Sequence, residues 1–253
     1  MVALGQGGKT LAEGSVNTQS LSGTGPTYLW DVATKSITAT LTDPRSRGVY
    51  SVAFCGRTLA VGDGNGKVYL WDAATKSITA TLTDPGGKGE HPVAFGRACR
   101  TVAVGDGNGK VYLWDVATQR ITATATFTIP QSGRVLSLAI TPGGGTLAAA
   151  GGTNANSKVY LWDAATKTIT ATLGNPAGQV IGSLQFGPDG TTLAVGDDNG
   201  KVYLWDAATK RIIATLAPHP TGQRMNSVAF GTGGTTLAAG CSNGKIYLWN
   251  VAA

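Results

Sequence analysis

The sequence has few of the residues on which most catalytic and metal sites depend. It contains two histidines and three cysteines, and 13% of its 253 residues are charged. The cysteines, Cys55, Cys99 and Cys241, are odd in number and share no metal-ligand spacing. We therefore expect free thiols in a reducing, cytoplasmic setting, with a Cys55–Cys99 redox pair as the alternative. No two carboxylates stand out as acid and base, so we expect neither an enzyme nor a metal or cofactor site.

Long apolar runs are also missing. The residues after Met1 lack the apolar core of a signal peptide, and no window approaches a membrane span, which argues against a membrane partner. No segment has the 3.6-residue period of an amphipathic helix. The net charge of +6 is scattered rather than gathered in runs, and no aromatic residues are interleaved with it, so nucleic acid is not the expected partner. Glycine is abundant, at 37 residues, which suits short strands joined by tight turns.

One short motif recurs along the whole chain. Tyr-Leu-Trp occurs six times, ending at Trp30, Trp71, Trp114, Trp162, Trp205 and Trp249, which are all the tryptophans in the sequence. Successive tryptophans are 41, 43, 48, 43 and 44 residues apart. Self-similarity at this period indicates a repeat architecture, whose units stack because none can bury its apolar face alone.

The repeat that begins at Ser51 shows what each unit builds. Its short apolar or alternating runs are separated by turn residues, which predicts strands a, b, c and d of an antiparallel meander at 51–54, 58–62, 67–71 and 77–82. Asn-Gly lies between strands b and c in four repeats, at 65–66, 108–109, 199–200 and 243–244. Asn-Gly favours a type I′ hairpin, because both central residues of that turn need positive φ.

Repeats that end in Leu-Trp-Asp, with a Phe-Gly-Pro-Asp-Gly turn at 186–190, resemble the WD40 family of β-propellers. The resemblance covers essentially the whole chain, and the Asp-Pro-Gly loop at 84–86 is similar to bacterial members. It implies an all-β, six-bladed WD40-like propeller of four-stranded antiparallel blades in one domain, 1–253, with strand a innermost. The blades fall at about 1–42, 49–83, 90–128, 135–174, 181–217 and 225–253.

The chain departs from the family in the residues around each tryptophan. Many WD40 repeats have Gly-His before strand a, and the His joins a buried network with a Ser, an Asp and the Trp. Asp-Pro or Asn-Pro occupies that place here, at 43–44, 84–85 and 175–176. Strand b offers Gly or Ala instead of Ser, and Asn replaces the turn Asp. We therefore expect the tryptophans to pack between blades without that network.

A second departure lies in the turn after strand c. Lysine occupies a slot where the family usually has glycine, at Lys35, Lys76, Lys167 and Lys210. If the backbone there is left-handed, each lysine costs about 1 kcal/mol. The alternative is a turn of another form.

The ends of the chain leave the repeats unequal. Residues 1–4 align with strand a, and only four residues follow Trp249, so the chain has six a, b and c strands but five d strands. Strand c of the last blade then has an open edge that invites pairing with another chain, including self-association. We favour an intact ring with a three-stranded last blade. The alternatives are a chain cut from a longer protein, an edge completed by a partner or second copy, and cover from the insertion at 15–26.

Three sequence patterns could indicate a binding or catalytic site, but the repeat structure explains each pattern better. Residues 3–10 fit a relaxed phosphate-loop pattern, but the repeat places them in an a–b hairpin rather than between a strand and a helix. The Asp-rich b–c turns lack the later acid of a calcium loop. His91 and His219 lie in different loops, each beside a proline, and neither has a nucleophile and an acid nearby in sequence.

The loops from strand d into strand a are the part that is not copied. They span 43–49, 84–90, 128–135, 174–181 and 217–225, and the position that opens strand a is Tyr50, His91, Leu136, Gly182 or Asn226. In a WD40 ring these loops surround the channel mouth. Tyr, Arg and Met are enriched where interfaces carry binding energy. The expected anchors are Tyr50, Arg45, Arg47, His91, Arg134, Leu136, Arg224, Met225 and Asn226. The alternative is neutral drift of exposed loops.

These observations favour a non-catalytic binding scaffold that recognises a protein or peptide at the channel-mouth face. A ring of lysines opening the c strands, at Lys67, Lys110, Lys158, Lys201 and Lys245, is interpreted as a solubility feature. Other hypotheses remain: a propeller that binds a small, sugar-like ligand, a sensor domain from a larger multidomain bacterial protein, and an engineered repeat protein.

Overall fold

A computed structural model describes residues 1–5, 8–15, 25–86, 89, 91–130, 133–152, 157–217, 223–231 and 233–251. The chain divides into two compact units, Met1–Thr128 and Ile129–Ala253. The insertion at 15–26, His219 and parts of three d–a loops lie largely or wholly outside the described residues. No helix in the described part of the chain is long and apolar enough to cross a membrane.

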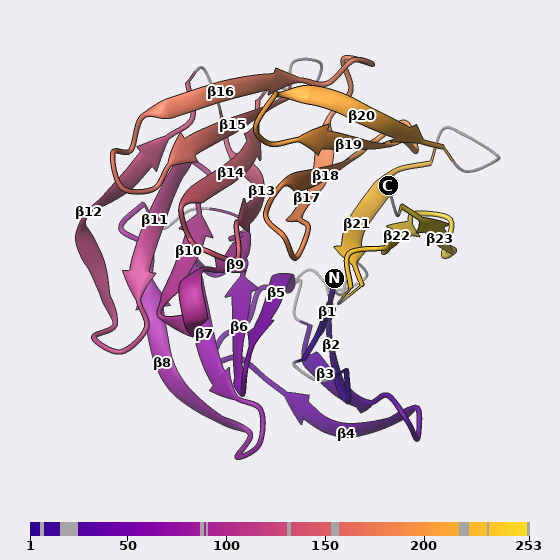
Figure 1. Ribbon diagram of the computed structural model, residues 1–253. Helices are drawn as coiled ribbons and strands as arrows, with labels where there is room; N and C mark the ends of the chain where they lie inside the picture. Colours follow the sequence, from indigo (N-terminus) through magenta and orange to yellow (C-terminus); the bar gives the residue numbers. More distant parts are fainter. Residues whose placement is uncertain are drawn as a thin grey trace. The chain divides into compact units, whose positions relative to one another are not determined.

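The first unit contains three four-stranded antiparallel sheets (Figure 1). Each is a meander of consecutive strands, because turns of a few residues connect only neighbouring antiparallel strands. The first sheet has β1 (Val2–Leu4), β2 (Thr10–Gly14), β3 (Thr27–Asp31) and β4 (Ser36–Leu41); the second has β5 (Val49–Cys55), β6 (Thr58–Asp63), β7 (Lys67–Asp72) and β8 (Ser77–Thr83); the third has β9 (Val93–Phe95), β10 (Thr101–Gly105), β11 (Lys110–Asp115) and β12 (Arg120–Thr128), with a short 3-10 turn, η1 (Arg97–Cys99).

The second unit contains two sheets of four strands and one of three. The fourth sheet has β13 (Val135–Ile140), β14 (Thr146–Gly151), β15 (Lys158–Asp163) and β16 (Ile169–Gly174); the fifth has β17 (Ile181–Phe186), β18 (Thr192–Asp197), β19 (Val202–Asp206) and β20 (Arg211–Leu216); the sixth has β21 (Met225–Phe230), β22 (Thr236–Cys241) and β23 (Ile246–Asn250). The six sheets are the blades of a six-bladed β-propeller fold, and the prediction that the last lacks its outer strand is confirmed in the described residues.

The b–c hairpins form where Asn-Gly predicted them, but the prediction of type I′ turns is wrong. Gly66 has φ 87°, whereas Asn65 is not among the residues with positive φ. A three-residue loop joins β6 to β7, and such loops typically combine a type I turn with a left-handed glycine. The Asp63 carboxylate accepts a hydrogen bond from the Asn65 N–H at 2.8 Å. This side-chain bond stabilises the longer turn, so the aspartate is part of the hairpin signal.

The glycines of strand b let neighbouring sheets approach closely. A Cβ on Gly62 of β6 would lie 1.9 Å from the carbonyl oxygen of His91, which precedes β9. A Cβ on Gly14 would lie 2.4 Å from Cγ1 of Val49, and one on Gly196 would lie 3.0 Å from Cβ of Met225. The same position in three sheets must therefore lack a side chain, because the next strand a occupies that space. This explains why the chain has glycine where the family more often has serine.

Serines of strand a connect three sheets to the sheet that follows within the same unit. Ser51 Oγ accepts the Val93 N–H at 3.0 Å in the first unit. In the second unit Ser137 Oγ accepts the Leu184 N–H at 3.0 Å, and Ser183 Oγ accepts the Val228 N–H at 2.9 Å. A backbone donor at the innermost strand is thus satisfied by the preceding sheet, which fixes the spacing of adjacent strands a.

The tryptophans of two sheets donate hydrogen bonds to buried or half-buried carboxylates. Trp71 Nε1 donates to Asp43 Oδ1 at 2.8 Å, and Trp30 Nε1 donates to Glu13 Oε2 at 3.0 Å. The residues of the family's histidine network are absent at these two tryptophans, as expected, and a carboxylate is their polar partner instead. Asp43, in the place of the usual histidine, provides the acceptor because a buried indole N–H needs one.

The turn after strand c is left-handed at all four lysines in question. The φ angles are 54° for Lys35, 58° for Lys76, 61° for Lys167 and 62° for Lys210, and Gln119 takes the same position with 56°. Two of these side chains reach the outer strand of the preceding sheet. Lys76 Nζ donates to the Thr38 carbonyl at 3.1 Å, and Gln119 Nε2 donates to the equivalent Thr79 carbonyl at 3.4 Å. A contact of this kind, which glycine cannot make, offsets part of the backbone cost.

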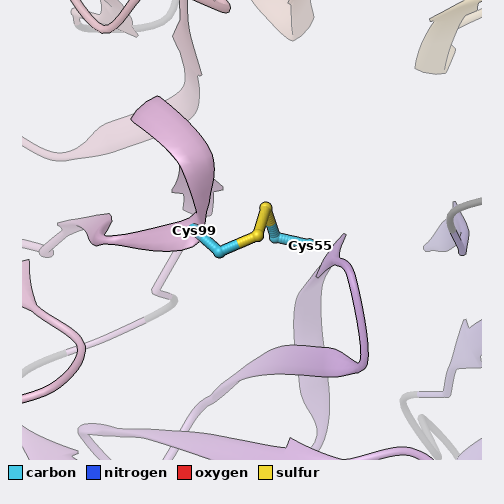
Figure 2. The surroundings of a disulfide bond; sticks show 2 residues. All are labelled: Cys55 and Cys99. Carbon is cyan, nitrogen blue, oxygen red and sulfur yellow. A yellow bond between two sulfur atoms is a disulfide. The ribbon is translucent and has the colours of Figure 1, made fainter.

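A disulfide joins Cys55, in the β5–β6 hairpin, to Cys99, at the end of η1 (Figure 2). The two residues are in equivalent hairpins of neighbouring sheets, and their Cα atoms are 5.5 Å apart. The expectation of free thiols is therefore wrong for this pair, and the redox-pair alternative is the arrangement observed. Cys241 is a buried free thiol. Cysteine usage consequently no longer argues for a reducing compartment.

Candidate functional site

The d–a loop of the second sheet is anchored to the b–c turn of the same sheet. The fully buried carboxylate of Asp63 accepts hydrogen bonds from the Ser46 hydroxyl and, at 2.9 Å, from the Arg47 N–H. Asn65 Nδ2 donates to the carbonyls of Pro44 and Arg45, both at 3.2 Å. These bonds hold the backbone of an irregular loop in one conformation, so the side chains that it exposes have fixed positions.

Three predicted anchors lie together at this end of the second sheet. Arg45 and Arg47 are exposed, and Arg45 has a left-handed backbone with φ 57°. Tyr50 is half-buried, and its ring packs over the b–c turn, because a Cβ on Gly64 would lie 2.7 Å from its Cε2 atom. The first unit thus presents one aromatic ring and two guanidinium groups on a loop held by Asp63.

Tyr50 occupies a β-bulge. The register between β5 and β6 shifts between Val49 and Ser51, and the shift falls at the same place in the fourth, fifth and sixth sheets. The bulged residues are Tyr50, Leu136, Gly182 and Asn226, which are four of the five variable positions found in the sequence. A bulge re-aims one side chain without breaking the strand, so the position can vary while its neighbours stay constant.

The fifth variable position, His91, does not face solvent. It is fully buried, and its Nε2 lies 3.2 Å from Asp84 Oδ2. Gly62 has no side chain, so the backbone of residue 91 packs directly on β6, and the imidazole lies against the buried carboxylate. The prediction that His91 is an exposed anchor is therefore wrong, and the residue belongs to the packing between the second and third sheets.

The second unit exposes a different set of side chains. Arg224 is exposed and its Nε lies 3.0 Å from Asp198 Oδ1, so the guanidinium is held at the b–c turn of the fifth sheet. A Cβ on Gly182 would lie 3.4 Å from that Nε and 2.9 Å from the Met225 carbonyl oxygen. The glycine at this variable position therefore leaves the space that Arg224 occupies.

The remaining predicted anchors differ in exposure. Arg134 and Asn226 are exposed, whereas Leu136 is half-buried against the apolar cluster of the fourth and fifth sheets. Met225 is fully buried in the cluster of the fifth and sixth sheets, where Gly196 makes room for it. The prediction that Met225 is a surface anchor is wrong, because its side chain is a core contact.

Carboxylates at this end of the second sheet are shielded from solvent. Burial raises the pKa of Asp43 to about 7; the Trp71 hydrogen bond opposes that rise and the nearby charge of Asp63 adds to it. Burial also raises the pKa of Tyr69, whose hydroxyl donates to the Pro44 carbonyl at 2.8 Å. Each group has a structural partner, Trp71 for Asp43 and the Pro44 carbonyl for Tyr69.

The described residues bear on two of the chemical sites considered, a metal site and a phosphate loop. Among the described residues, no group of three His, Cys, Asp or Glu side chains is placed to hold a metal ion. Residues 3–5 and 8–10 form the β1–β2 hairpin, in which the Gly5 N–H donates to the Thr10 carbonyl at 2.7 Å. Strand β2 rather than a helix follows, so this segment has no helix N-terminus to bind phosphate.

Sequence comparison of the repeats missed the residues that position the site. Asp63 holds the loop that carries Arg45 and Arg47, and Asp198 and Gly182 set the position of Arg224, but the sequence marked none of the three as a positioning residue. A signal was available for Asp63, because Asp opens three of the b–c turns that contain Asn-Gly, at 63, 106 and 197–198.

Comparison with known families finds three matches to the model of the WD domain, G-beta repeat, at residues 35–72, 167–206 and 210–250. Each match starts at a left-handed lysine, covers one outer strand, and continues through strands a, b and c of the next sheet. A comparison with curated proteins found no significant match. The three matches and the six repeated sheets together assign the chain to the WD40-repeat β-propeller family.

Proposed function

We propose that the chain is a non-catalytic scaffold that binds a protein or peptide through the d–a loops and the bulged positions of its strands a. WD40 propellers generally act as protein-interaction scaffolds, and the family is generally non-catalytic. The observation that carries the proposal is the contrast at one end of the sheets. Several side chains that differ between repeats are exposed there, and in the second sheet the buried Asp63 holds the loop that carries them.

The chemistry of this end favours a partner with acidic groups. Arg45 and Arg47 are exposed in the first unit, and in the second unit the Arg224 side chain is 48% exposed although it is paired with Asp198. Guanidinium groups bind carboxylates through paired, charge-assisted hydrogen bonds. Tyr50 adds a half-buried aromatic surface of the kind that interfaces use as an anchor. A peptide segment that combines acidic and apolar side chains fits Tyr50, Arg45 and Arg47 of the first unit.

Capture by immobilised protein tests the proposal. We expect a partner captured by the wild-type chain to be lost with the double variant Tyr50→Ala and Arg224→Ala, while the thermal unfolding curve is unchanged. The matched control is the double variant Arg57→Ala and Arg211→Ala, because Arg57 lies in the a–b hairpin and Arg211 opens an outer strand. Unchanged capture by the first double variant would contradict the site.

Stoichiometry separates this proposal from a small-ligand propeller. A protein partner recognised by non-repeated side chains should bind once per chain in a titration with the purified partner. Several equal sites per chain would instead indicate pockets made by the repeated residues, and would contradict the proposal.

A further inference from the structure

Two b–c turns of the first unit have the same sequence. Residues 60–67 and 103–110 both read Ala-Val-Gly-Asp-Gly-Asn-Gly-Lys, and each turn has an asparagine, Asn65 or Asn108, directly before a glycine. The turns are also alike in structure. Each asparagine N–H donates to the carboxylate of the aspartate that opens its turn, at 2.8 Å for Asn65 and at 2.9 Å for Asn108. A difference in reactivity between the two asparagines must therefore come from the residues around the turns.

An Asn-Gly pair can lose ammonia through attack by its own backbone. The glycine nitrogen gives its proton to a base in solution and forms a bond to the asparagine Cγ atom, and the bond from Cγ to the amide nitrogen breaks. That nitrogen takes up a proton and leaves as ammonia, and a succinimide ring remains. One water molecule then opens the ring at either carbonyl, which gives aspartate or isoaspartate. Glycine favours the attack because it has no side chain to hinder the approach.

The side chain of Asn65 is held against this reaction. Its Nδ2 donates to the carbonyls of Pro44 and Arg45, both at 3.2 Å, and to the Tyr69 hydroxyl at 3.0 Å. Ring closure expels this same Nδ2, so it breaks hydrogen bonds that the folded loop makes. The folded state therefore slows the reaction at Asn65, because each bond that is broken adds to the barrier.

The side chain of Asn108 makes no hydrogen bond in the part of the chain that the structure describes, although its backbone N–H does. The loop beside it differs from the loop beside Asn65. Arg45 has a left-handed backbone with φ 57°, whereas the equivalent Gly86 is not among the residues with positive φ. The nucleophile is also weakly held, because the Gly109 N–H donates to the Asp106 carbonyl at 3.4 Å, which is longer than an ordinary amide hydrogen bond.

We propose that Asn108 is a site of spontaneous deamidation in the folded chain, through a succinimide formed with Gly109, and that Asn65 is protected from the same reaction by its hydrogen bonds. The only co-reactant is water, and no electrons are transferred. The site is separate from the proposed function. Protection of Asn65 nevertheless preserves the loop that carries Arg45, since Asn65 holds the carbonyls of that loop.

Deamidation at position 108 adds a negative charge where two carboxylates already lie. A Cβ on Gly86 would lie 2.6 Å from Asp106 Oδ2, 2.8 Å from Asn108 Nδ2 and 3.3 Å from Asp84 Oδ2, so the three side chains surround one point. Asp84 and Asp106 are both buried. A carboxylate in place of the Asn108 amide is repelled by these two charges, and the repulsion is strong where water is excluded. The modification therefore destabilises the third sheet.

Mass spectrometry of the aged full chain tests the site. The folded chain is kept in mildly alkaline buffer, sampled over several weeks and digested briefly with trypsin. Because trypsin cleaves after lysine and arginine, it releases residues 58–67 and 101–110 as separate peptides, which differ only in having Leu59 or Val102. We expect the deamidated fraction to grow at least roughly tenfold faster in 101–110 than in 58–67, since breaking the hydrogen bonds of Asn65 raises its barrier.

The unfolded chain is the control for local sequence. In concentrated urea with reductant, no folded loop holds either asparagine, so the two peptides should deamidate at equal rates. Tyr69→Phe tests the hydrogen bonds themselves. It removes one acceptor from Asn65 Nδ2, so deamidation of 58–67 should become several-fold faster while that of 101–110 is unchanged. If circular dichroism shows that this variant is misfolded, the ratio of rates in the folded and unfolded wild type decides alone.

The consequence for stability is tested with two variants. Asn108→Asp adds the charge that deamidation would add, and Asn108→Ser removes the amide without adding a charge. We expect a lower melting temperature for Asn108→Asp than for Asn108→Ser.

Several results would overturn the proposal. Equal rates in the folded chain, a faster rate at Asn65, no change in either peptide while the unfolded control reacts, or a difference that persists in urea would each exclude Asn108 as the selective site. An unchanged rate at Asn65 in a folded Tyr69→Phe variant would exclude protection by hydrogen bonds. Equal melting temperatures of Asn108→Asp and Asn108→Ser would exclude the destabilisation. None of these results bears on the loop site, which is tested by capture of a partner.

Discussion

Removal of the Cys55–Cys99 disulfide should destabilise the first unit by a measurable and bounded amount. The bond closes a loop of 44 residues between two neighbouring sheets. In the chain-entropy model, a loop of that length removes about 4 kcal/mol of conformational freedom from the unfolded state. This figure is the upper bound for the loss of stability in a double variant Cys55→Ala and Cys99→Ala.

The backbone near Cys99 sets the lower bound. Ala98 has φ 47° and Cys99 has φ 63°, so two consecutive non-glycine residues are left-handed. Such a conformation costs roughly 1 kcal/mol at each residue, and part of that cost can be released when the bond no longer holds the segment. The expected loss is therefore between about 2 and 4 kcal/mol, which corresponds to a fall in melting temperature of roughly 5–15 °C for a unit of this size.

Urea denaturation of the oxidised chain, the double variant and the wild type treated with reductant measures this loss. The reduced wild type and the double variant should have the same midpoint, and hydrogen exchange should locate the lost protection in the second and third sheets. Cys241→Ala is the control for cysteine removal without loss of a bond, since Cys241 is a free thiol. A loss below about 1 kcal/mol, or a reductant effect in the double variant, would refute the reasoning.

Three further predictions concern the backbone and a buried carboxylate. Lys35→Gly relieves a left-handed residue with φ 54°, so it should raise the free energy of unfolding by about 1 kcal/mol, as a higher urea midpoint with an unchanged m-value would show. Gly62→Ala should destabilise the chain by at least about 1–3 kcal/mol, because the new Cβ would lie 1.9 Å from the His91 carbonyl oxygen. Gly240→Ala is the control and should leave the stability unchanged, since no atom lies within 4 Å of its new Cβ. Equal melting temperatures of the two variants would contradict this reasoning. The pKa of Asp43 is raised from its ordinary value of 3.8 to about 7 in the folded state. Between these two pH values the folded state keeps a proton on Asp43 that the unfolded state has released. The wild type therefore loses stability as pH rises from about 4 to 7. Asp43→Asn keeps an acceptor for the tryptophan and removes the charge, so its stability relative to the wild type should increase over that range and stay constant above it; a difference independent of pH would contradict the raised pKa.

The strand pattern could be predicted because it depends on local chemistry. Six copies of Tyr-Leu-Trp, the turn residues between them and the absence of a fourth strand after Trp249 led to the observed strand order and to a three-stranded last sheet. The left-handed turn at Lys35 and its equivalents was one of two forms considered, and it is the one found. Each of these features is decided within a single repeat.

The exposure of the candidate site residues was predicted only in part, because exposure depends on the neighbouring sheet. Arg45, Arg47 and Arg224 are exposed as expected. His91 and Met225 have the same kind of loop position, yet both are buried, because Gly62 and Gly196 of the preceding sheets leave space that the next strand fills. No pattern within one loop reports the size of a residue about 30 positions earlier on another strand.

The sequence by itself determined the period, the strand order and the positions that vary, since each follows from side-chain alternation and turn chemistry over a few residues. The tertiary structure decided which thiols pair, which carboxylate receives the Trp71 indole N–H and which variable residues reach solvent. These outcomes depend on the approach of neighbouring sheets to within hydrogen-bonding and van der Waals distance, and that approach joins residues tens of positions apart.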